Sequence, residues 1–168
     1  MQLTGKEIIE RGIVTNYCKS GIQQQGVDVR LKSISKVDQC QIGLVPIEGK
    51  TRIPKYQELT PQISYDGRAT YHLDTGYYEV TLEEACNIPS NSSLHYKTRS
   101  SLVRCGAIVH SGQFDAGFKT DAMGCFLQVI HPITIERGAR IAQAIVFESN
   151  EVTNTYDGQW QEDQQRKQ

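Results

Sequence analysis

The sequence lacks any long apolar run, and no stretch approaches the roughly 20 residues that a membrane-spanning helix needs. It also lacks an excess of positive charge, because its 18 lysines and arginines are balanced by 19 aspartates and glutamates. A general nucleic-acid surface is therefore not expected. The first residues, MQLTGKEIIERG, are charged and amphipathic, unlike a signal peptide. We expect a cytoplasmic protein with neither a membrane nor a nucleic acid as its partner.

Cysteine pairs with metal-binding spacing are also missing. The cysteines are scattered, odd in number and never in a CxxC arrangement; they are Cys18, Cys40, Cys86, Cys105 and Cys125. This pattern argues against a zinc site and against a disulfide framework. Buried free thiols are the expected state.

Helical periodicity is scarce beyond the first residues of the chain. Residues 3–12 predict one short helix, because Thr4 can cap it, Glu7 occupies the third position after the cap and Gly12 can end it. Elsewhere, short stretches alternate between apolar and polar residues, separated by Gly, Pro, Asn or Asp. These stretches are residues 27–31, 71–73, 77–80, 107–109, 126–130 and 142–147.

The spacing of these stretches is typical of an all-β barrel or sandwich. With 168 residues, of which 38 % are hydrophobic and 22 % charged, the chain fits one domain spanning residues 1–168 and can form a core. Residues 50–67 are polar and predict a loop. The tail, residues 154–168, is polar too, and its lone Trp160 indicates that it docks on a ligand or a neighbouring subunit.

Two segments carry charged side chains that a barrel does not require. In residues 22–31, Asp28 and Arg30 flank an apolar position of a strand and therefore share one face. The plain alternative for them is a surface ion pair. Residues 97–104 hold two arginines, one lysine and three hydroxyls beside a potential helix start. These groups and free backbone N–H groups suit phosphate oxygens, and the alternative is a solvated basic turn.

Two further segments carry a single polar group in apolar surroundings. Asp115 lies between Phe114 and Phe118, where exclusion of water would make a carboxylate a stronger base. A simple Asp-x-Gly turn is the alternative. In residues 136–147 a turn leads into a buried strand with one amide, Gln143, which needs a partner from the backbone or from a ligand.

The order and spacing of these segments resemble the dCTP deaminase/dUTPase superfamily. IQ with GVDVRL in residues 22–31 is similar to the family's IQP-(S/G)-x-D-L-R-L strand. The other matching motifs are YYEV through IP in residues 77–89, RSSLVR in 99–104, FDAGF in 114–118, GARIAQ in 138–143 and YDGQWQ in 156–161. RSSLxR followed closely by DAGF is a specific signature, and the resemblance covers most of the chain.

The resemblance implies a distorted β-barrel or jelly roll, of the dUTPase-like β-clip kind, assembled as a homotrimer with active sites between subunits. It implies that magnesium (Mg2+) is carried by the triphosphate of the substrate, dUTP or dCTP, without a metal ligand from the protein. The implied catalytic residues are Asp115, beside the attacking water, and Arg104 and Ser100, at the phosphates. The implied substrate-binding residues are Arg99, Ser100, Ser101, Arg104, Gln128, Gln143, Tyr156, Gln159 and Gln161.

Two activities of this family need different side chains. Its deaminases carry a proton-shuttling Glu in a G-x-I-x-L-E run after the turn that contains the Asp. Here the strand from Gly124 reads GCFLQVIH, so either Val129 or Gln128 takes the Glu position, and neither can act as a general acid or base. The loop after His110 is also shorter than the deaminase loop. Release of pyrophosphate needs only an Asp, arginines, hydroxyls and a metal.

The residues present therefore favour a deaminase-like dUTPase, of the archaeal or viral type, which hydrolyses dUTP to dUMP. Three features depart from the family pattern: residues 119–123 look inserted, Gln159 replaces the usual tail Lys, and the Gly-rich, Phe-containing arm of ordinary dUTPases is absent. One alternative is a dCTP deaminase or a bifunctional enzyme, in which Asp121 or another acid replaces the Glu. Another is a silent member that binds nucleotide or protein as a regulator.

Overall fold

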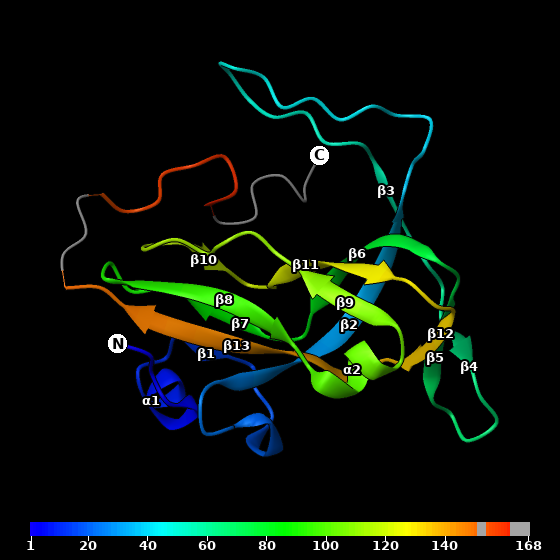
Figure 1. The fold of residues 1–168 in the computed structure, drawn as a ribbon, viewed down its shortest axis with the longest axis horizontal. Helices are drawn as coiled ribbons and strands as arrows, with labels where there is room; N and C mark the ends of the chain where they lie inside the picture. Colours follow the sequence, from blue (N-terminus) through cyan, green and yellow to red (C-terminus); the bar gives the residue numbers. More distant parts are fainter. Residues whose placement is uncertain (151–153, 162–168) are drawn as a thin grey trace.

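The computed structural model describes residues 1–150 and 154–161 (Figure 1). Its helical elements are short; they are α1 (Gly5–Glu10), α2 (Ser100–Arg104) and the 3-10 turn η1 (Lys19–Gly21). None of the described helices is long and apolar enough to cross a bilayer.

Helix α1 begins as the sequence predicts. The Thr4 hydroxyl accepts a hydrogen bond from the Glu7 backbone N–H, and the Glu7 carboxylate accepts one from the Thr4 backbone N–H. This reciprocal capping box satisfies two N–H groups that would otherwise have no partner. The helix is shorter than predicted, because Arg11 already caps its C-terminus and Gly12 follows with a φ of 65°.

The other regular elements of the described chain are β-strands. They are β1 (Val14–Thr15), β2 (Val27–Val37), β3 (Tyr56–Glu58), β4 (Gln62–Ile63), β5 (Ala69–Leu73), β6 (Gly76–Leu82), β7 (Ala85–Asn87), β8 (Ser92–Thr98), β9 (Ala107–His110), β10 (Lys119–Thr120), β11 (Gly124–Val129), β12 (Ile133–Glu136) and β13 (Arg140–Glu148). Every predicted stretch lies in or overlaps one of these strands, which confirms the all-β prediction. Strand β8 escaped prediction because serines, a histidine and a lysine interrupt its apolar pattern.

The main sheet has the strand order β8–β13–β2–β6–β11–β9, with β3 pairing to the far end of β2. Its two edges also touch. The Thr98 hydroxyl on β8 bonds to both the N–H and the carbonyl of Val109 on β9, at 3.0 and 3.2 Å, and Leu94 on β8 bridges Phe114. The sheet therefore nearly closes, which confirms the predicted distorted barrel. Two small sheets, β1–β7–β10 and β12–β5–β4, flank it.

Apolar side chains from both ends of the sequence fill the core of this barrel. Those with less than 2 % exposure include Leu3, Ile8, Ile13, Leu31, Ile34, Leu82, Leu94, Met123, Leu127 and Ile141. Each such burial contributes roughly 1.5–3 kcal/mol to folding. Met123 belongs to residues 119–123, which looked inserted in the sequence. That segment is a packed part of the fold, since its first two residues form β10.

Residues 38–55, which we call the arm, project from the barrel between β2 and β3 (Figure 1). The backbones of Leu44 and Arg52 exchange hydrogen bonds of 2.9 and 3.0 Å, and the Asp38 N–H bonds to the Lys55 carbonyl at the base. The arm exposes the apolar side chains Ile42, Leu44, Val45, Ile47 and Ile53. The predicted loop at residues 50–67 is thus partly wrong, because it contains half of this hairpin together with β3 and β4.

All the cysteines are free thiols, as predicted, but only some are buried. Cys86 and Cys125 lie in the core, where burial raises the pKa of the Cys125 thiol. Cys40 and Cys105 are exposed. Cys18 is partly exposed, and its Sγ lies 3.2 Å from the Ser20 hydroxyl, which lowers the pKa of the thiol.

Candidate active site

Strand pairing places three polar side chains in a row at one end of the main sheet. Lys97 on β8 is opposite Gln143 on β13, and Gln143 is opposite Asp28 on β2. A Cβ at Gly26 would lie 2.3 Å from the Ala144 carbonyl oxygen, so only glycine lets the backbone approach this row so closely. The row lines an open depression of ≈ 240 Å³ together with Gln23, Thr98, Arg99 and Ser100. We call this the basic depression.

Asp28 is the carboxylate to which the arginines at the basic depression are paired. Its side chain is only 4 % exposed, and its Oδ2 lies 3.4 Å from Arg99 Nε and 3.3 Å from Arg140 Nη1. Its Oδ1 accepts a long hydrogen bond of 3.5 Å from Gln143 Nε2. A buried carboxylate is costly unless it is paired, and two guanidinium groups compensate this one. The surface ion pair considered for Asp28 and Arg30 is therefore wrong.

Arg30 belongs to a separate network, with Glu84 and Asn16. Its Nε lies 2.6 Å from Glu84 Oε1, its backbone N–H donates to Glu84 Oε2 at 2.7 Å, and its Nη2 donates to the Asn16 carbonyl at 2.6 Å. Burial raises the pKa of Glu84, although the hydrogen bonds from Arg30 act in the opposite direction. The same contact raises the pKa of Arg30.

Helix α2 carries the other residues predicted to contact phosphates. Ser100, Ser101 and Arg104 are exposed, whereas Arg99, the N-cap residue, is half-buried and donates from Nη1 to the Arg140 carbonyl at 3.3 Å. Within residues 1–150 and 154–161, the Arg104 side chain makes no ion pair. Its guanidinium N–H groups are thus available to a ligand that reaches the helix.

Asp115 lies at the opposite end of β8 from Arg99. Phe114 bridges Leu94 near the start of that strand, whereas Arg99 follows its last residue. A strand rises about 3.3 Å per residue, so five residues separate the two regions by roughly 16 Å. Figure 1 shows the same relationship, with α2 at one end of β8 and β10, which follows the Asp115 turn, at the other.

The surroundings of Asp115 differ from the sequence expectation. Its side chain is exposed, and its Oδ1 accepts a 2.8 Å hydrogen bond from Gln113 Nε2. The flanking aromatic rings pack against the core, where Phe114 meets Tyr96 at 5.3 Å and Phe118 at 5.4 Å between centroids. Within one chain, these rings therefore do not exclude water from the carboxylate.

The described part of the tail, residues 154–161, packs on the Asp115 turn of its own chain. The Tyr156 N–H donates to the Ala116 carbonyl at 2.6 Å, and the Tyr156 ring meets Phe118 at 5.4 Å. Gln161 accepts from the Lys119 N–H at 3.1 Å and donates to the Gly117 carbonyl at 3.0 Å.

Gly117 has a φ of 83°, and a Cβ there would lie 2.9 Å from Thr155 Cβ, so the close approach of the tail requires glycine. Trp160 is 39 % exposed. Residues 151–153 and the tail residues 162–168 lie outside the described part.

Gln128 belongs neither to the basic depression nor to the Asp115 turn with its tail. On β11 the side chains alternate: Val129 is 1 % exposed in the core, whereas Gln128 is exposed and its Oε1 lies 2.9 Å from His110 Nε2. The pairing of β11 with β6 is continuous from Gly124, so no inserted residue shifts this register. Both candidates for the deaminase Glu position thus lack a carboxylate, and Asp121 is exposed in the turn before the strand.

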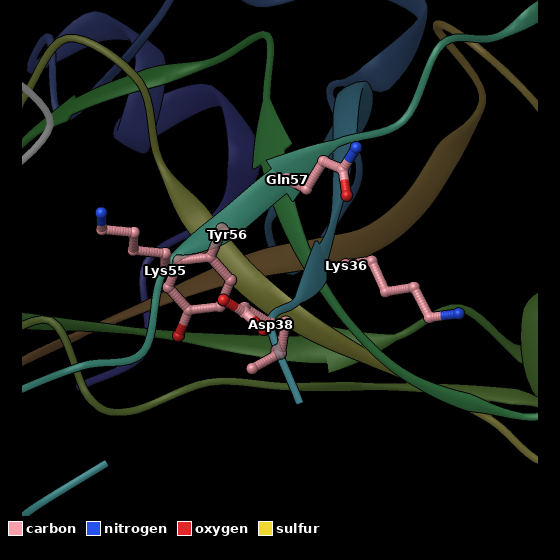
Figure 2. A pocket seen from close by; sticks show the side chains of 6 residues that line it. Lys36, Asp38, Lys55, Tyr56 and Gln57 are labelled. Atoms are coloured by element: carbon pink, nitrogen blue, oxygen red, sulfur yellow. The ribbon is translucent and has the colours of Figure 1, made fainter. Parts of the chain in front are cut away.

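A second depression, of ≈ 300 Å³, lies at the base of the arm and is lined by Lys36, Val37, Asp38, Lys55, Tyr56 and Gln57 (Figure 2). The amines of Lys36 and Lys55 point to opposite sides of the Tyr56 ring. The carboxylate of Asp38 lies beside that ring, between the two amines. Since the two cations do not converge on one anion, this depression does not offer a phosphate site.

No group of three His, Cys, Asp or Glu side chains that could hold a metal ion occurs in the part of the chain that the structure describes. Asp28 is the carboxylate of the basic depression, and it already faces two guanidinium groups. The protein groups of the depression are therefore suited to phosphate oxygens rather than to a metal caged by side chains.

Comparison with known proteins defines the class to which this barrel and its basic depression belong. The dCTP deaminase-like family matches residues 2–150. The chain is a member of that family.

Two archaeal relatives show the likeness in more detail. A probable deoxyuridine 5'-triphosphate nucleotidohydrolase of Halobacterium salinarum is 36 % identical over 141 residues, which cover 83 % of this chain and 82 % of the relative. A deoxyuridine 5'-triphosphate nucleotidohydrolase of Methanocaldococcus jannaschii is 34 % identical over 146 residues, covering 85 % and 88 %.

A solved structure is similar in fold. The 2'-deoxycytidine 5'-triphosphate deaminase of Agrobacterium tumefaciens superposes with a TM-score of 0.62 at 19 % sequence identity. The match covers 88 % of this chain but 48 % of the other, so this chain spans about half the length of that structure. The likeness concerns the fold alone.

Proposed function

We propose that this chain is a dUTP diphosphatase that hydrolyses dUTP to dUMP and pyrophosphate. A water molecule attacks phosphorus and the bond between the α- and β-phosphates breaks. Pyrophosphate leaves, and Asp115 accepts the proton of the water. The observation that carries the proposal is the composition of β11. Val129 is buried and Gln128 is an amide bonded to His110, so the strand offers no carboxylate for deamination.

The basic depression and the adjoining helix α2 supply the groups that pyrophosphate release needs. Arg99, Ser100, Ser101 and Arg104 bind the phosphates, and Gln143 reaches them from β13. Arg99 and Arg140 outweigh the single charge of Asp28, and Lys97 adds a further cation. Such donors stabilise the charge that develops on a leaving phosphate. The relatives named as deoxyuridine triphosphate nucleotidohydrolases support the same substrate.

The active enzyme in this proposal is a homotrimer with sites between subunits. Its support is the separation of Arg99 from Asp115 by most of the length of β8, so that Asp115 does not line the depression that holds Arg99 within one chain. A neighbouring subunit brings the second half of the site. Tyr156, Gln159 and Gln161 then belong to the Asp115 half of the site, and Gln128 stays a predicted substrate-binding residue.

Magnesium in this proposal is carried by the triphosphate, whose oxygens are the ligands that this ion prefers. When bound it adds positive charge at the leaving phosphates. The location proposed is the cytoplasm, in keeping with cysteines that are all free although two are exposed.

The decisive experiment incubates the pure protein with dUTP or with dCTP in magnesium and separates the products by chromatography. We expect dUMP and pyrophosphate from dUTP and no change in dCTP. Formation of dUTP or dUMP from dCTP contradicts the proposal and makes the protein a deaminase or a bifunctional enzyme. That second candidate is favoured by the fold likeness to a dCTP deaminase. Sedimentation of an active monomer contradicts the trimer.

A further inference from the structure

The tail segment is held at two places, not only at the Asp115 turn. Tyr156 and Gln161 attach it to that turn through their contacts with Ala116, Gly117 and Lys119. Between them, the side chain of Gln159 reaches a different part of the fold, the arm. In Figure 1 the tail, in red, runs below the arm, in cyan.

The contact between Gln159 and the arm uses both ends of one carboxamide. Gln159 Oε1 accepts from the Thr51 backbone N–H at 3.1 Å, and Gln159 Nε2 donates to the Thr51 carbonyl at 3.2 Å. Both bonds are partly buried. The amide therefore pairs with the backbone as a neighbouring strand would, and the Thr51 side chain takes no part.

We propose that Gln159 is a positioning residue that ties the tail to the arm and so holds the tail across the Asp115 turn. Thr51 adjoins Arg52, which pairs with Leu44 across the arm. The Gln159 amide therefore binds the arm next to the place where its two sides are hydrogen-bonded to each other. The arm thereby becomes a support for the tail.

The chemistry of the side chain at position 159 is specific for this role. A carboxamide donates from its nitrogen and accepts at its oxygen, whereas an ammonium group has three donors and no acceptor. Gln159→Lys therefore leaves the Thr51 N–H without its partner. Gln159→Glu keeps that acceptor but sets a negative charge against the Thr51 carbonyl. Each of these changes breaks one of the two bonds.

The first test measures amide hydrogen exchange of residues 154–161 in the full-length protein without nucleotide. Two neutral hydrogen bonds are lost in Gln159→Ala, so we expect exchange of the Tyr156 and Gln161 amides to quicken about 5- to 30-fold. Thr51→Ala is the matched control, because it changes the side chain and leaves both backbone partners. It is expected to exchange like the wild type.

A second pair of variants isolates the backbone partner. Thr51→Pro removes the N–H that Gln159 accepts from and should quicken tail exchange by itself. Adding Gln159→Ala to Thr51→Pro should then have a smaller effect than the same change in the Thr51→Ala background. Equal effects in the two backgrounds show that Gln159 does not act through Thr51 and overturn the proposal. So does wild-type exchange of the tail in Gln159→Ala.

A kinetic readout extends the inference to turnover and rests on the proposed function. A loosely held tail must be ordered when substrate binds, so Gln159→Ala should raise KM for dUTP about 5- to 30-fold with kcat and melting temperature unchanged. Because hydrogen exchange is measured without substrate, inactivity toward dUTP overturns the proposed function without affecting the contact between tail and arm. An unchanged KM in an active enzyme overturns the positioning role.

Discussion

The carboxylate of Glu84 and the guanidinium of Arg30 form a salt bridge of 2.6 Å in which the Glu84 side chain is fully buried. Removal of Arg30 leaves a buried carboxyl without its compensating charge. Arg30→Ala is therefore expected to lower the free energy of unfolding by about 3–5 kcal/mol at pH 7, measured by urea denaturation. Arg68→Ala is the control, because Arg68 pairs with Asp66 and Glu136 on the surface and should cost at most about 1 kcal/mol.

The same pair predicts a pH dependence. Burial raises the pKa of Glu84, so the folded protein holds this proton more tightly than the unfolded chain does. Its contribution to stability is complete below the unfolded pKa, near 4.5, and is lost as pH rises through the folded pKa. Arg30→Ala removes the guanidinium, whose hydrogen bond and charge oppose this shift, and leaves the hydrogen bond from the backbone N–H of residue 30. Its destabilisation relative to wild type should therefore grow from pH 4 to pH 7, and a constant difference would falsify this account.

Arg104 is exposed and makes no ion pair within the described residues, so we expect its role to lie in ligand binding. Arg104→Ala should weaken binding of dUTP by about 10- to 100-fold, since a charged hydrogen bond contributes roughly 1.5–3 kcal/mol. Binding of deoxyuridine, which has no phosphate, should not change. Calorimetry with both ligands checks this. Arg137→Ala, which alters an exposed arginine near Glu83, is the control. Equal losses for both ligands indicate a structural role for Arg104.

Asp115→Asn should lower single-turnover hydrolysis of dUTP about 10²- to 10⁴-fold with little change in nucleotide affinity. The carboxylate is exposed and its hydrogen bond comes from Gln113, so the melting temperature should stay near that of the wild type. Asp121→Asn, at the next exposed acid along the chain, is the matched control. A folded Asp115→Asn protein with normal turnover rules out the water-orienting role, and loss of turnover in Asp121→Asn transfers that role to Asp121.

Cys18 should be the most reactive thiol of the folded protein. The Ser20 hydroxyl lowers the pKa of the Cys18 thiol, and the thiolate is the nucleophile. Alkylation at pH 7 followed by mass spectrometry should modify Cys18 before the exposed Cys40 and Cys105, and Ser20→Ala should slow it. The buried Cys86 and Cys125 should react only in denaturant. Equal rates at Cys18 and Cys40 would contradict this expectation.

Local patterns in the sequence were sufficient for the elements whose cause is local. The capping box of Thr4 and Glu7 predicted the start of α1, and alternation of apolar residues predicted the long strands. Strand β8 was missed because His95, Tyr96 and Lys97 occupy consecutive positions of its sequence. Its place in the sheet depends on pairing with β13, almost fifty residues further along, as in Lys97 with Gln143.

The partners of Asp28 could not be predicted for the same physical reason. Arg30, two residues away, was the nearest cation in the sequence, whereas Arg140 lies 112 residues away and reaches Asp28 only because β2 and β13 are neighbours. The signature residues Arg99, Ser100 and Gln143 do line one depression, as the motifs suggested. The exposure of Asp115 depends on ring packing between Phe114, Phe118 and Tyr96, which no spacing rule specifies.

The position of Arg99 and Asp115 at opposite ends of β8 has a genetic consequence. When each site is shared by two chains, two variants with substitutions in different halves of the site can complement each other. In the proposed homotrimer, mixed assemblies refolded from equal amounts of Arg104→Ala and Asp115→Asn chains would contain sites in which both contributing halves are intact. Random mixing makes this about one site in four, so at dUTP concentrations too low to saturate the Arg104→Ala protein the mixture should recover roughly a quarter of wild-type turnover.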